Sequence, residues 1–277
     1  TSCPSLTRTR PSSGPMKICT WNVNSLKARA EYVTGFLDEV QPDVLCIQEL
    51  KLATDMVPTE IFESRGYHVA VHGQKQWNGV LLASLEPLTQ VVTGFPGEEE
   101  QARLVAATVA GIRIFNLYCP QGQSADSDKF QYKLRFYDAL GDWLEQNEDP
   151  EGAVVVMGDL NIAPLPRDVH DPQAMFGVPT FHPRELERWG RLAWWGLQDT
   201  MVDRLARPAT TPVRICIIML VWKRSQVMDF IHHHSRLRHT IRIVPVPHGT
   251  EEATQWMSLP ALPDLPFRRR RSHLLAV

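Results

Sequence analysis

Short apolar runs alternate with amphipathic segments as far as about residue 200, and this alternation restricts the folds open to the chain. Runs typical of strands cover residues 17–21, 44–48, 67–71, 79–84, 103–109, 112–118 and 154–157. Helical spacing of apolar residues extends from a cap at Asn24 or Ser25 to Pro42, and recurs over residues 57–65 and 128–145. Because βα units are combined with a hairpin around Ala110 and Gly111, we expect an α/β fold with layered, partly antiparallel sheets.

The size and composition of the chain fit one globular domain. Its 277 residues are 43% hydrophobic and 22% charged, and these values exclude a disordered, collagenous or coiled-coil protein. The longest apolar stretch, residues 215–222, is far shorter than the roughly 18 to 20 residues of a membrane span. We therefore expect no membrane partner.

Cysteine usage and the N-terminal residues favour a cytoplasmic protein. Five cysteines, an odd number without a CxxC pair, lie mostly inside apolar runs, which predicts reduced and buried thiols. Residues 1–15 are rich in Ser, Thr and Pro and lack the apolar segment of a secretory signal. We expect a disordered leader or tag before Met16, with an organelle-targeting peptide as the alternative.

Polar side chains follow four of the expected strands at the point where each strand ends. They are Asn22, Glu49, Tyr118 and the pair Asp159 and Asn161. Any one of them alone is more often a helix cap or a turn former. Four such strand ends together predict an active site, because α/β folds collect functional groups there.

These residue types suit the hydrolysis of a phosphodiester assisted by a metal. Glu49 and Asp159 are hard oxygen ligands and Asn22 and Asn161 are neutral oxygen donors, a set that fits Mg²⁺ or Mn²⁺. Asp159 can orient the attacking water and Glu49 can hold the metal, while Asn161 and Tyr118 donate hydrogen bonds to phosphate oxygens.

Motifs for other chemistries are missing from the sequence. It contains no GxxxxGK[ST] loop, no GxGxxG, no GxSxG and no HExxH. Three adjacent histidines at 232–234 suggest a metal site, but neighbours in a strand point to alternate faces, so a solvated run is the simpler interpretation.

Several segments, in a consistent order, resemble bacterial exonuclease III. The match is most specific in NLYCPQG at 116–122, MGDLNIAP at 157–164 and WGLQDT at 195–200, and further matching segments cover residues 16–29, 41–49, 73–75, 79–82, 95–97, 129–130 and 136–137. The resemblance implies a four-layer α/β sandwich, with two packed sheets and helices outside. It also implies Mg²⁺-dependent cleavage beside abasic sites, 3′ to 5′ exonuclease action and 3′ end cleaning on double-stranded DNA.

The same resemblance implies roles for individual residues. Asn22 and Glu49 would belong to the metal site together with Asp159 and Asn161, and Asp159 would also orient the water. Asn161 and Tyr118 would contact the phosphate in the transition state.

Contacts to the DNA backbone are implied for three further residues. These are Arg103, Gln121 and Lys129. Arg103 and Lys129 have an alternative interpretation as ordinary solvated charges, because long basic side chains are usually exposed.

The last 73 residues differ from the rest of the chain. Residues 205–277 hold 11 Lys and Arg against 4 Asp and Glu, which leaves 18 against 27 for residues 1–204. They contain one glycine, no asparagine and no tyrosine, and end near the run of four arginines at 268–271. Such a change in charge and composition marks a boundary near residue 205. We nevertheless expect residues 16–277 to form a single domain, of which residues 205–277 are an atypical part.

This tail also departs from exonuclease III. A relative should continue with Trp-Trp-Asp-Tyr-Arg, Arg-Ile-Asp and Ser-Asp-His-Ala-Pro segments, and none is intact. Asp229 can replace the aspartate of the Arg-Ile-Asp segment as a metal-site residue. His273, in Ser-His-Leu, matches the Ser-Asp-His-Ala-Pro segment only poorly.

Two explanations of the tail remain open. We hypothesise a reading frame disrupted after about Pro208, and the alternative is a divergent C-terminal module whose arginine run binds nucleic acid or stays solvated. Either way, the last strands of the sandwich are expected to be disrupted. An uncovered sheet edge would lower stability, and loss of the His–Asp pair would weaken catalysis or abolish it.

Three functions compete at this stage. The leading hypothesis is a monomeric DNA-repair nuclease, the second is an inactive protein that still binds nucleic acid, and the third is a small-molecule phosphoesterase of the same superfamily. The net charge of −2 does not itself support DNA binding, so a local basic groove would have to supply it.

Overall fold

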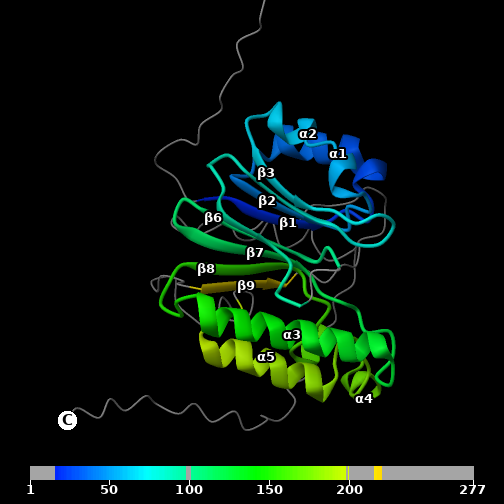
Figure 1. Ribbon diagram of the computed structural model, residues 1–277. Coiled ribbons are helices and arrows are strands. Elements are labelled where there is room, and N and C mark those ends of the chain that lie inside the picture. Colours follow the sequence, from blue (N-terminus) through cyan, green and yellow to red (C-terminus); the bar gives the residue numbers. More distant parts are fainter. Residues whose placement is uncertain (1–15, 98–100, 198, 200–214, 220–277) are drawn as a thin grey trace, which may run out of the picture.

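A computed structural model describes residues 16–97, 101–197, 199 and 215–219. Two sheets lie against each other, and helices cover the outer face of each sheet (Figure 1). The expected four-layer α/β sandwich is thus confirmed for these residues. Residues 1–15 and 220–277, including Asp229 and His273, lie outside the described part of the chain.

The first sheet is assembled from the N-terminal strands. Its order is β1 (Ile18–Asn22), β2 (Val44–Gln48), β4 (Val80–Ser84) and β3 (His68–His72). β1 and β2 run parallel, and the other two pairs are antiparallel. Every residue of β2 and β4 is buried, on both faces of the sheet. This is expected for central strands that lie between two apolar layers.

The second sheet contains the predicted hairpin. Its order is β5 (Thr89–Thr93), β6 (Leu104–Val109), β7 (Ile112–Tyr118), β8 (Val154–Asp159) and β9 (Ile215–Met219). Val109 pairs with Ile112 across a two-residue turn, and Ala110 and Gly111 both have positive φ, as a tight hairpin turn requires.

The strand β9 comes from the atypical tail. We expected the last strands of the sandwich to be disrupted, and within the described residues one strand after residue 205, Ile215–Met219, pairs parallel with β8. Five consecutive apolar residues suit a strand beside the apolar β8, which explains why this part of the atypical tail joins the sheet.

Helices complete the outer layers. α1 (Leu26–Glu39) and α2 (Glu60–Glu63) cover the first sheet, and α3 (Asp128–Asn147) and α5 (Pro183–Trp195) cover the second (Figure 1). The shorter η1 (Thr54–Met56), η2 (Pro166–Asp168) and α4 (Pro172–Met175) lie in connections. Ser25 caps α1 as predicted, but the helix expected over 57–65 is only the four residues of α2.

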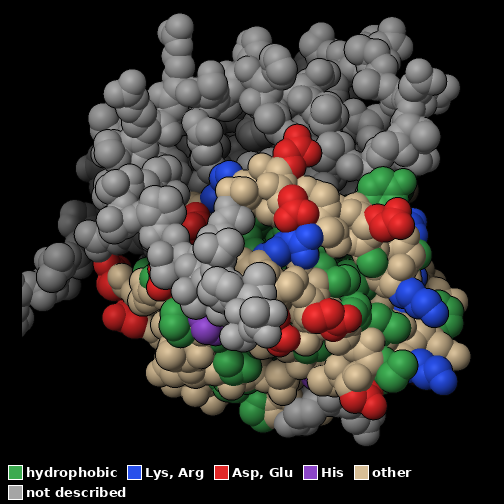
Figure 2. All heavy atoms as spheres, turned by 90° about the horizontal axis from the view of Figure 1, so that it is seen from above, with side chains coloured by type: hydrophobic (Ala, Val, Ile, Leu, Met, Phe, Trp, Pro, Cys, Tyr) green, Lys and Arg blue, Asp and Glu red, His purple; other side chains and the backbone are tan. Residues whose placement is uncertain are grey.

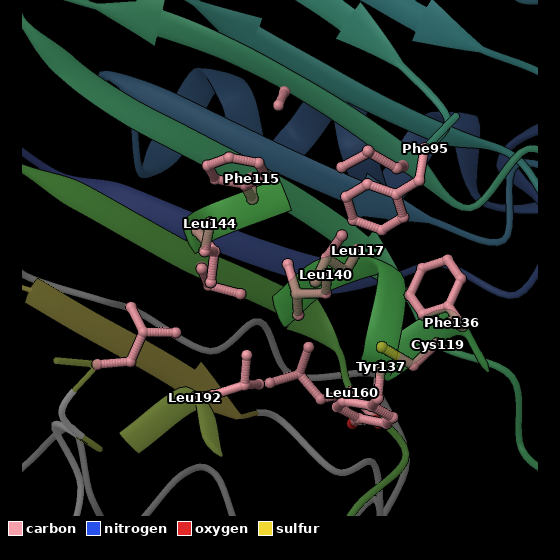
Figure 3. Close-up of a cluster of buried hydrophobic side chains, with 14 of the residues drawn as sticks. Phe95, Phe115, Leu117, Cys119, Phe136, Tyr137, Leu140, Leu144, Leu160 and Leu192 are labelled. Atoms are coloured by element: carbon pink, nitrogen blue, oxygen red, sulfur yellow. Dashed lines mark hydrogen bonds between the residues drawn. The ribbon is translucent and has the colours of Figure 1, made fainter. Parts of the chain in front are cut away.

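Apolar side chains fill all three interfaces between the layers. One cluster lies between the first sheet and α1, one between the two sheets, and one between the second sheet and α3 and α5 (Figure 3). On the face above α1 and α2, acidic and basic side chains are mixed, as is typical of a solvated helix layer (Figure 2). No described helix is long and apolar enough to cross a membrane. Cys19, Cys46 and Cys119 are buried and form no disulfide, as predicted.

A buried polar network joins the two sheets. The Nε2 of Gln48 donates to Thr20 Oγ1 at 2.8 Å and to Asn116 Oδ1 at 2.6 Å. The Nδ2 of Asn116 in turn donates to the carbonyl oxygens of Ile47 at 3.0 Å and Leu81 at 2.8 Å. Since all donors and acceptors are withdrawn from water, the network fixes how β7 sits over β2 and β4.

Replacing Asn116 with leucine is expected to lower the free energy of unfolding by about 3 kcal/mol, because it leaves the Gln48 amide and two carbonyls without their partner. Urea unfolding followed by circular dichroism measures the change. Asn147→Leu is the matched control, since the Asn147 amide makes one exposed bond to Trp143 O. Equal effects of the two substitutions would contradict the role assigned to the network.

Candidate active site

The strand ends singled out by the sequence meet at one place. Asn22 ends β1, Glu49 follows β2, Tyr118 ends β7 and Asp159 ends β8. β1 and β2 are parallel neighbours in one sheet, and β7 and β8 are parallel neighbours in the other. The carboxyl ends of all four strands therefore bring their side chains together between the sheets.

One amide group bridges the two carboxylates. The Nδ2 of Asn22 donates to Glu49 Oε1 at 2.7 Å and to Asp159 Oδ2 at 2.9 Å. The hydroxyl of Tyr118 donates to the same Glu49 oxygen at 2.9 Å. Glu49 and Asp159 come from different sheets, so the Asn22 amide links the two halves of the sandwich at this site.

Asn161 completes the group from the loop after β8. Its backbone N–H donates to Asp159 Oδ1 at 3.2 Å, and its Nδ2 donates to the carbonyl oxygen of Cys119 at 2.8 Å. Glu49 and Asn161 both have left-handed backbones, with φ of 57° and 50°. A non-glycine residue in this region costs roughly 1 kcal/mol or more, and such strain is concentrated at functional sites.

The environment shifts the pKa values of two of these groups. Burial raises the pKa of Asp159 to about 6, with a contribution from the charge of Glu49, while hydrogen bonds from Asn22 and Asn161 oppose the shift. Burial and the neighbouring Glu49 also raise the pKa of the Tyr118 hydroxyl well above its usual value. Tyr118 therefore remains a hydrogen-bond donor at neutral pH.

The donor set fits a hard divalent cation. Among the described residues no cluster of three or more His, Cys, Asp and Glu side chains could hold a metal ion. Two carboxylates beside neutral oxygen donors nevertheless suit Mg²⁺, which keeps several waters and takes one or two carboxylates. Asn22 turns its Nδ2 to both carboxylates, and its Oδ1 accepts the Asn24 N–H at 3.0 Å. In this arrangement the Asn22 amide aligns the two carboxylates, and its Oδ1 keeps a second lone pair.

The three residues expected to contact DNA occupy different environments. Arg103 packs against the site, because its guanidinium lies 5.0 Å from the centre of the Tyr118 ring and donates to the Tyr118 carbonyl at 3.0 Å. Gln121 and Lys129 are exposed beside the site loop and in the first turn of α3. Arg103 thus supports Tyr118, whereas the other two are free to meet a ligand.

Lys51 is a site residue that the sequence reasoning missed. Its ammonium lies 3.1 Å from Glu49 Oε2 and also donates to Asn24 Oδ1. Its position two residues after Glu49 was the only available signal. A positive charge there adds to the attraction for an anionic substrate.

Known proteins resemble this chain in sequence. A model of the endonuclease/exonuclease/phosphatase family matches residues 19–215. Exodeoxyribonuclease III of Haemophilus influenzae is 35% identical over 198 residues, which are 67% of this chain and 74% of that protein. Recombination repair protein 1 of Drosophila melanogaster is 27% identical over 67% of this chain and 28% of its own length.

Solved structures agree with these matches. An AP endonuclease from Archaeoglobus fulgidus superimposes with a TM-score of 0.65 at 37% identity, and covers 68% of this chain and 74% of its own. A 3′ phosphatase from Neisseria bound to a product DNA hairpin superimposes with a TM-score of 0.64 at 36% identity, with the same coverage. The chain therefore belongs to the endonuclease/exonuclease/phosphatase family and is a phosphodiester hydrolase similar to exodeoxyribonuclease III.

Proposed function

We propose that the protein is a Mg²⁺-dependent DNA-repair nuclease of the exonuclease III type. It would cut double-stranded DNA beside abasic sites and remove nucleotides and blocking groups from 3′ ends. The observation that carries the proposal is the Asn22 amide, which holds Glu49 and Asp159 together beside the Tyr118 hydroxyl. Three buried cysteines that form no disulfide fit work in a reducing compartment such as the cytoplasm.

Each residue of the site has a chemical task in this proposal. Glu49 and Asp159 would hold Mg²⁺, which supplies charge neutralisation at the phosphate when it is bound. Asp159 orients the attacking water and accepts a proton from it. The Asn161 amide would donate to a phosphate oxygen through the N–H that does not bind the Cys119 carbonyl, and the Tyr118 hydroxyl would donate by turning its single proton from Glu49 to the phosphate.

DNA is favoured over a small phosphoester by the surroundings of the site. Gln121 is exposed in the loop after Tyr118, Lys129 is exposed in the first turn of α3, which follows that loop, and Lys51 lies against Glu49. These side chains can contact successive phosphates of a DNA strand. A small phosphoester would need only the residues at the strand ends, around Glu49 and Asp159. The similar Neisseria structure holds a DNA hairpin, and we propose the same class of substrate for this chain. We also propose that this chain acts as a monomer.

The atypical tail is expected to limit turnover. Residues 205–277 lack an intact Ser-Asp-His segment, and a positioned acid–base pair contributes roughly 10²- to 10⁴-fold to such a reaction. We therefore propose slow cleavage, while the strand-end group retains metal and DNA binding. The extreme case is a protein that binds DNA without cutting it.

Incubating the full chain with a duplex that contains one abasic site tests this function. We expect nicking that requires Mg²⁺, stops in EDTA, returns when Mg²⁺ is added, and runs at least about 100-fold slower than nicking by the Haemophilus enzyme. Gel separation of the labelled strand gives the rate. Salt-sensitive binding without cleavage would favour the inactive DNA-binding alternative. Preferential hydrolysis of a soluble phosphoester would overturn the choice of DNA.

A further inference from the structure

Lys133 places a charge in the interior directly behind the candidate active site. It lies on the inner face of α3, and its side chain is fully buried. Its Nζ donates to the carbonyl oxygen of Asn161 at 2.6 Å and to that of Gln121 at 3.3 Å, and it forms an ion pair with Glu185 of α5. An ammonium group has three protons, so these three partners use its whole donor capacity.

Glu185 is tied into the start of its own helix. Its side chain is also fully buried, and its carboxylate accepts the backbone N–H groups of Thr180 at 2.9 Å and His182 at 3.0 Å. His182 caps α5, and Glu185 closes the capping box. The Lys133–Glu185 pair is therefore held at a fixed point of the α3–α5 layer.

The two carbonyls that Lys133 holds belong to the loops that carry the site. Gln121 lies in the loop after Tyr118, and Asn161 lies in the loop after Asp159. The loops also touch each other through the Asn161 amide and the Cys119 carbonyl. Gly122 has φ of 100°, and a Cβ there would lie 3.3 Å from Lys133 Cδ, so the first loop packs directly on the lysine stem.

We propose that Lys133 is a positioning residue for the phosphodiester hydrolysis proposed above, because its ammonium clamps both loops from behind and fixes the direction of the Asn161 side chain. The inference rests on that proposed function. Stability alone gives no reason for this pair, since a buried ion pair can often be replaced by apolar residues without loss. The orientation of two carbonyls from separate loops is what an apolar pair could not provide.

Three variants separate positioning from stability. Glu185→Gln removes one charge, keeps an acceptor for the Thr180 and His182 amides, and leaves both loop bonds of Lys133. Lys133→Met removes the loop bonds, and the double variant removes the loop bonds and both buried charges. Arg188→Met is the matched control, because Arg188 joins the same two helices through Asp138 and the Leu134 carbonyl without touching either loop.

Hydrogen exchange of the metal-free, DNA-free full chain gives the first measurement. In Lys133→Met and in the double variant, we expect exchange in residues 119–123 and 160–164 to be about 10-fold faster, the effect of losing one hydrogen bond to a charged group. Arg188→Met should leave both segments unchanged, and Glu185→Gln should leave residues 119–123 unchanged, since the Ala163 N–H of the second segment bonds to Thr180, a partner of Glu185. Unchanged protection in the double variant would overturn the proposal.

Cleavage of the abasic duplex, measured well below each unfolding temperature, gives the second. We expect kcat to fall by roughly 100-fold in both Lys133 variants with little change in KM, even where the double variant unfolds at the same temperature as the unmodified chain. A double variant that matches Glu185→Gln in kcat would reduce Lys133 to a structural residue and overturn the proposal. If the unmodified chain shows no cleavage at all, the proposed function fails, and the exchange pattern alone decides whether Lys133 holds the loops.

Discussion

Replacing Asp159 with asparagine is expected to lower DNA cleavage by roughly 1,000-fold or more while it stabilises the metal-free protein at neutral pH. The loss follows because asparagine can neither accept a proton from water nor bind Mg²⁺ as a carboxylate does. The gain in stability follows because Asp159 is largely buried next to Glu49. Burial and the Glu49 charge both make the ionised form of Asp159 less stable in the folded protein.

The sign of the stability effect comes from the pKa of Asp159. Burial raises it in the folded state from 3.8 to about 6, so between these values the folded protein binds the proton that the unfolded chain releases. The free energy of unfolding therefore falls as pH rises from about 4 to about 6 and stays lower above it. A shift of about two units corresponds to at most about 3 kcal/mol.

Urea titrations of the unmodified chain and Asp159→Asn in EDTA, at pH 4 and pH 7.5, measure this contribution. We expect Asp159→Asn to be more stable by about 1 to 3 kcal/mol at pH 7.5 and by almost nothing at pH 4. Asp138→Asn is the control, because that carboxylate sits in a partly buried ion pair with Arg188, away from Glu49. A variant that is less stable at pH 7.5, or that cleaves DNA normally, contradicts the role of Asp159.

The strand ends were predictable because two simple signals coincide there. Asn22, Glu49, Tyr118 and Asp159 are polar residues placed directly after apolar runs, and parallel strands bring their carboxyl ends to one edge. The helix α3 and the β6–β7 hairpin follow from periodicity and a turn signal in the same way. These features are local in the sequence, so they need no knowledge of tertiary partners.

The parts that were missed depend on partners far away in the chain. Lys133 reads as one more charged position on a helix until Glu185, 52 residues later, is seen beside it. Asn116 looks out of place in an apolar strand until Gln48 meets it from the other sheet. The edge strand β5 is mostly exposed and has no apolar alternation, so periodicity gave no signal for it.

Arg103 shows a different limit of sequence reasoning. The family resemblance implied a DNA contact for Arg103, and the structure adds that its guanidinium lies against the Tyr118 ring and carbonyl. A basic side chain near a phosphate site can act on the substrate, on a neighbouring residue or on both, and the sequence alone does not separate these roles.

Gly158→Ala is expected to prevent stable folding, with a loss of more than about 4 kcal/mol in the free energy of unfolding. Gly158 is the residue directly before Asp159 in β8, where β8 pairs with β7 at Leu117. Its φ of 127° is accessible mainly to glycine, and a Cβ there would overlap the carbonyl oxygen of Leu117 and lie 2.8 Å from its nitrogen. Backbone atoms in the middle of a sheet cannot move aside without breaking the β7–β8 pairing.

Gly190→Ala is the matched control for this substitution. Gly190 lies inside α5 with nothing within 4 Å of an added Cβ, so alanine should raise stability by about 0.5 to 1 kcal/mol through helix propensity. Thermal unfolding of the two variants, together with the soluble fraction after expression, measures the contrast. A soluble Gly158→Ala protein that unfolds near the temperature of the unmodified chain would mean that β8 can shift against β7. Asp159 would then have no fixed position opposite Glu49, because the Asn22 bridge depends on that register.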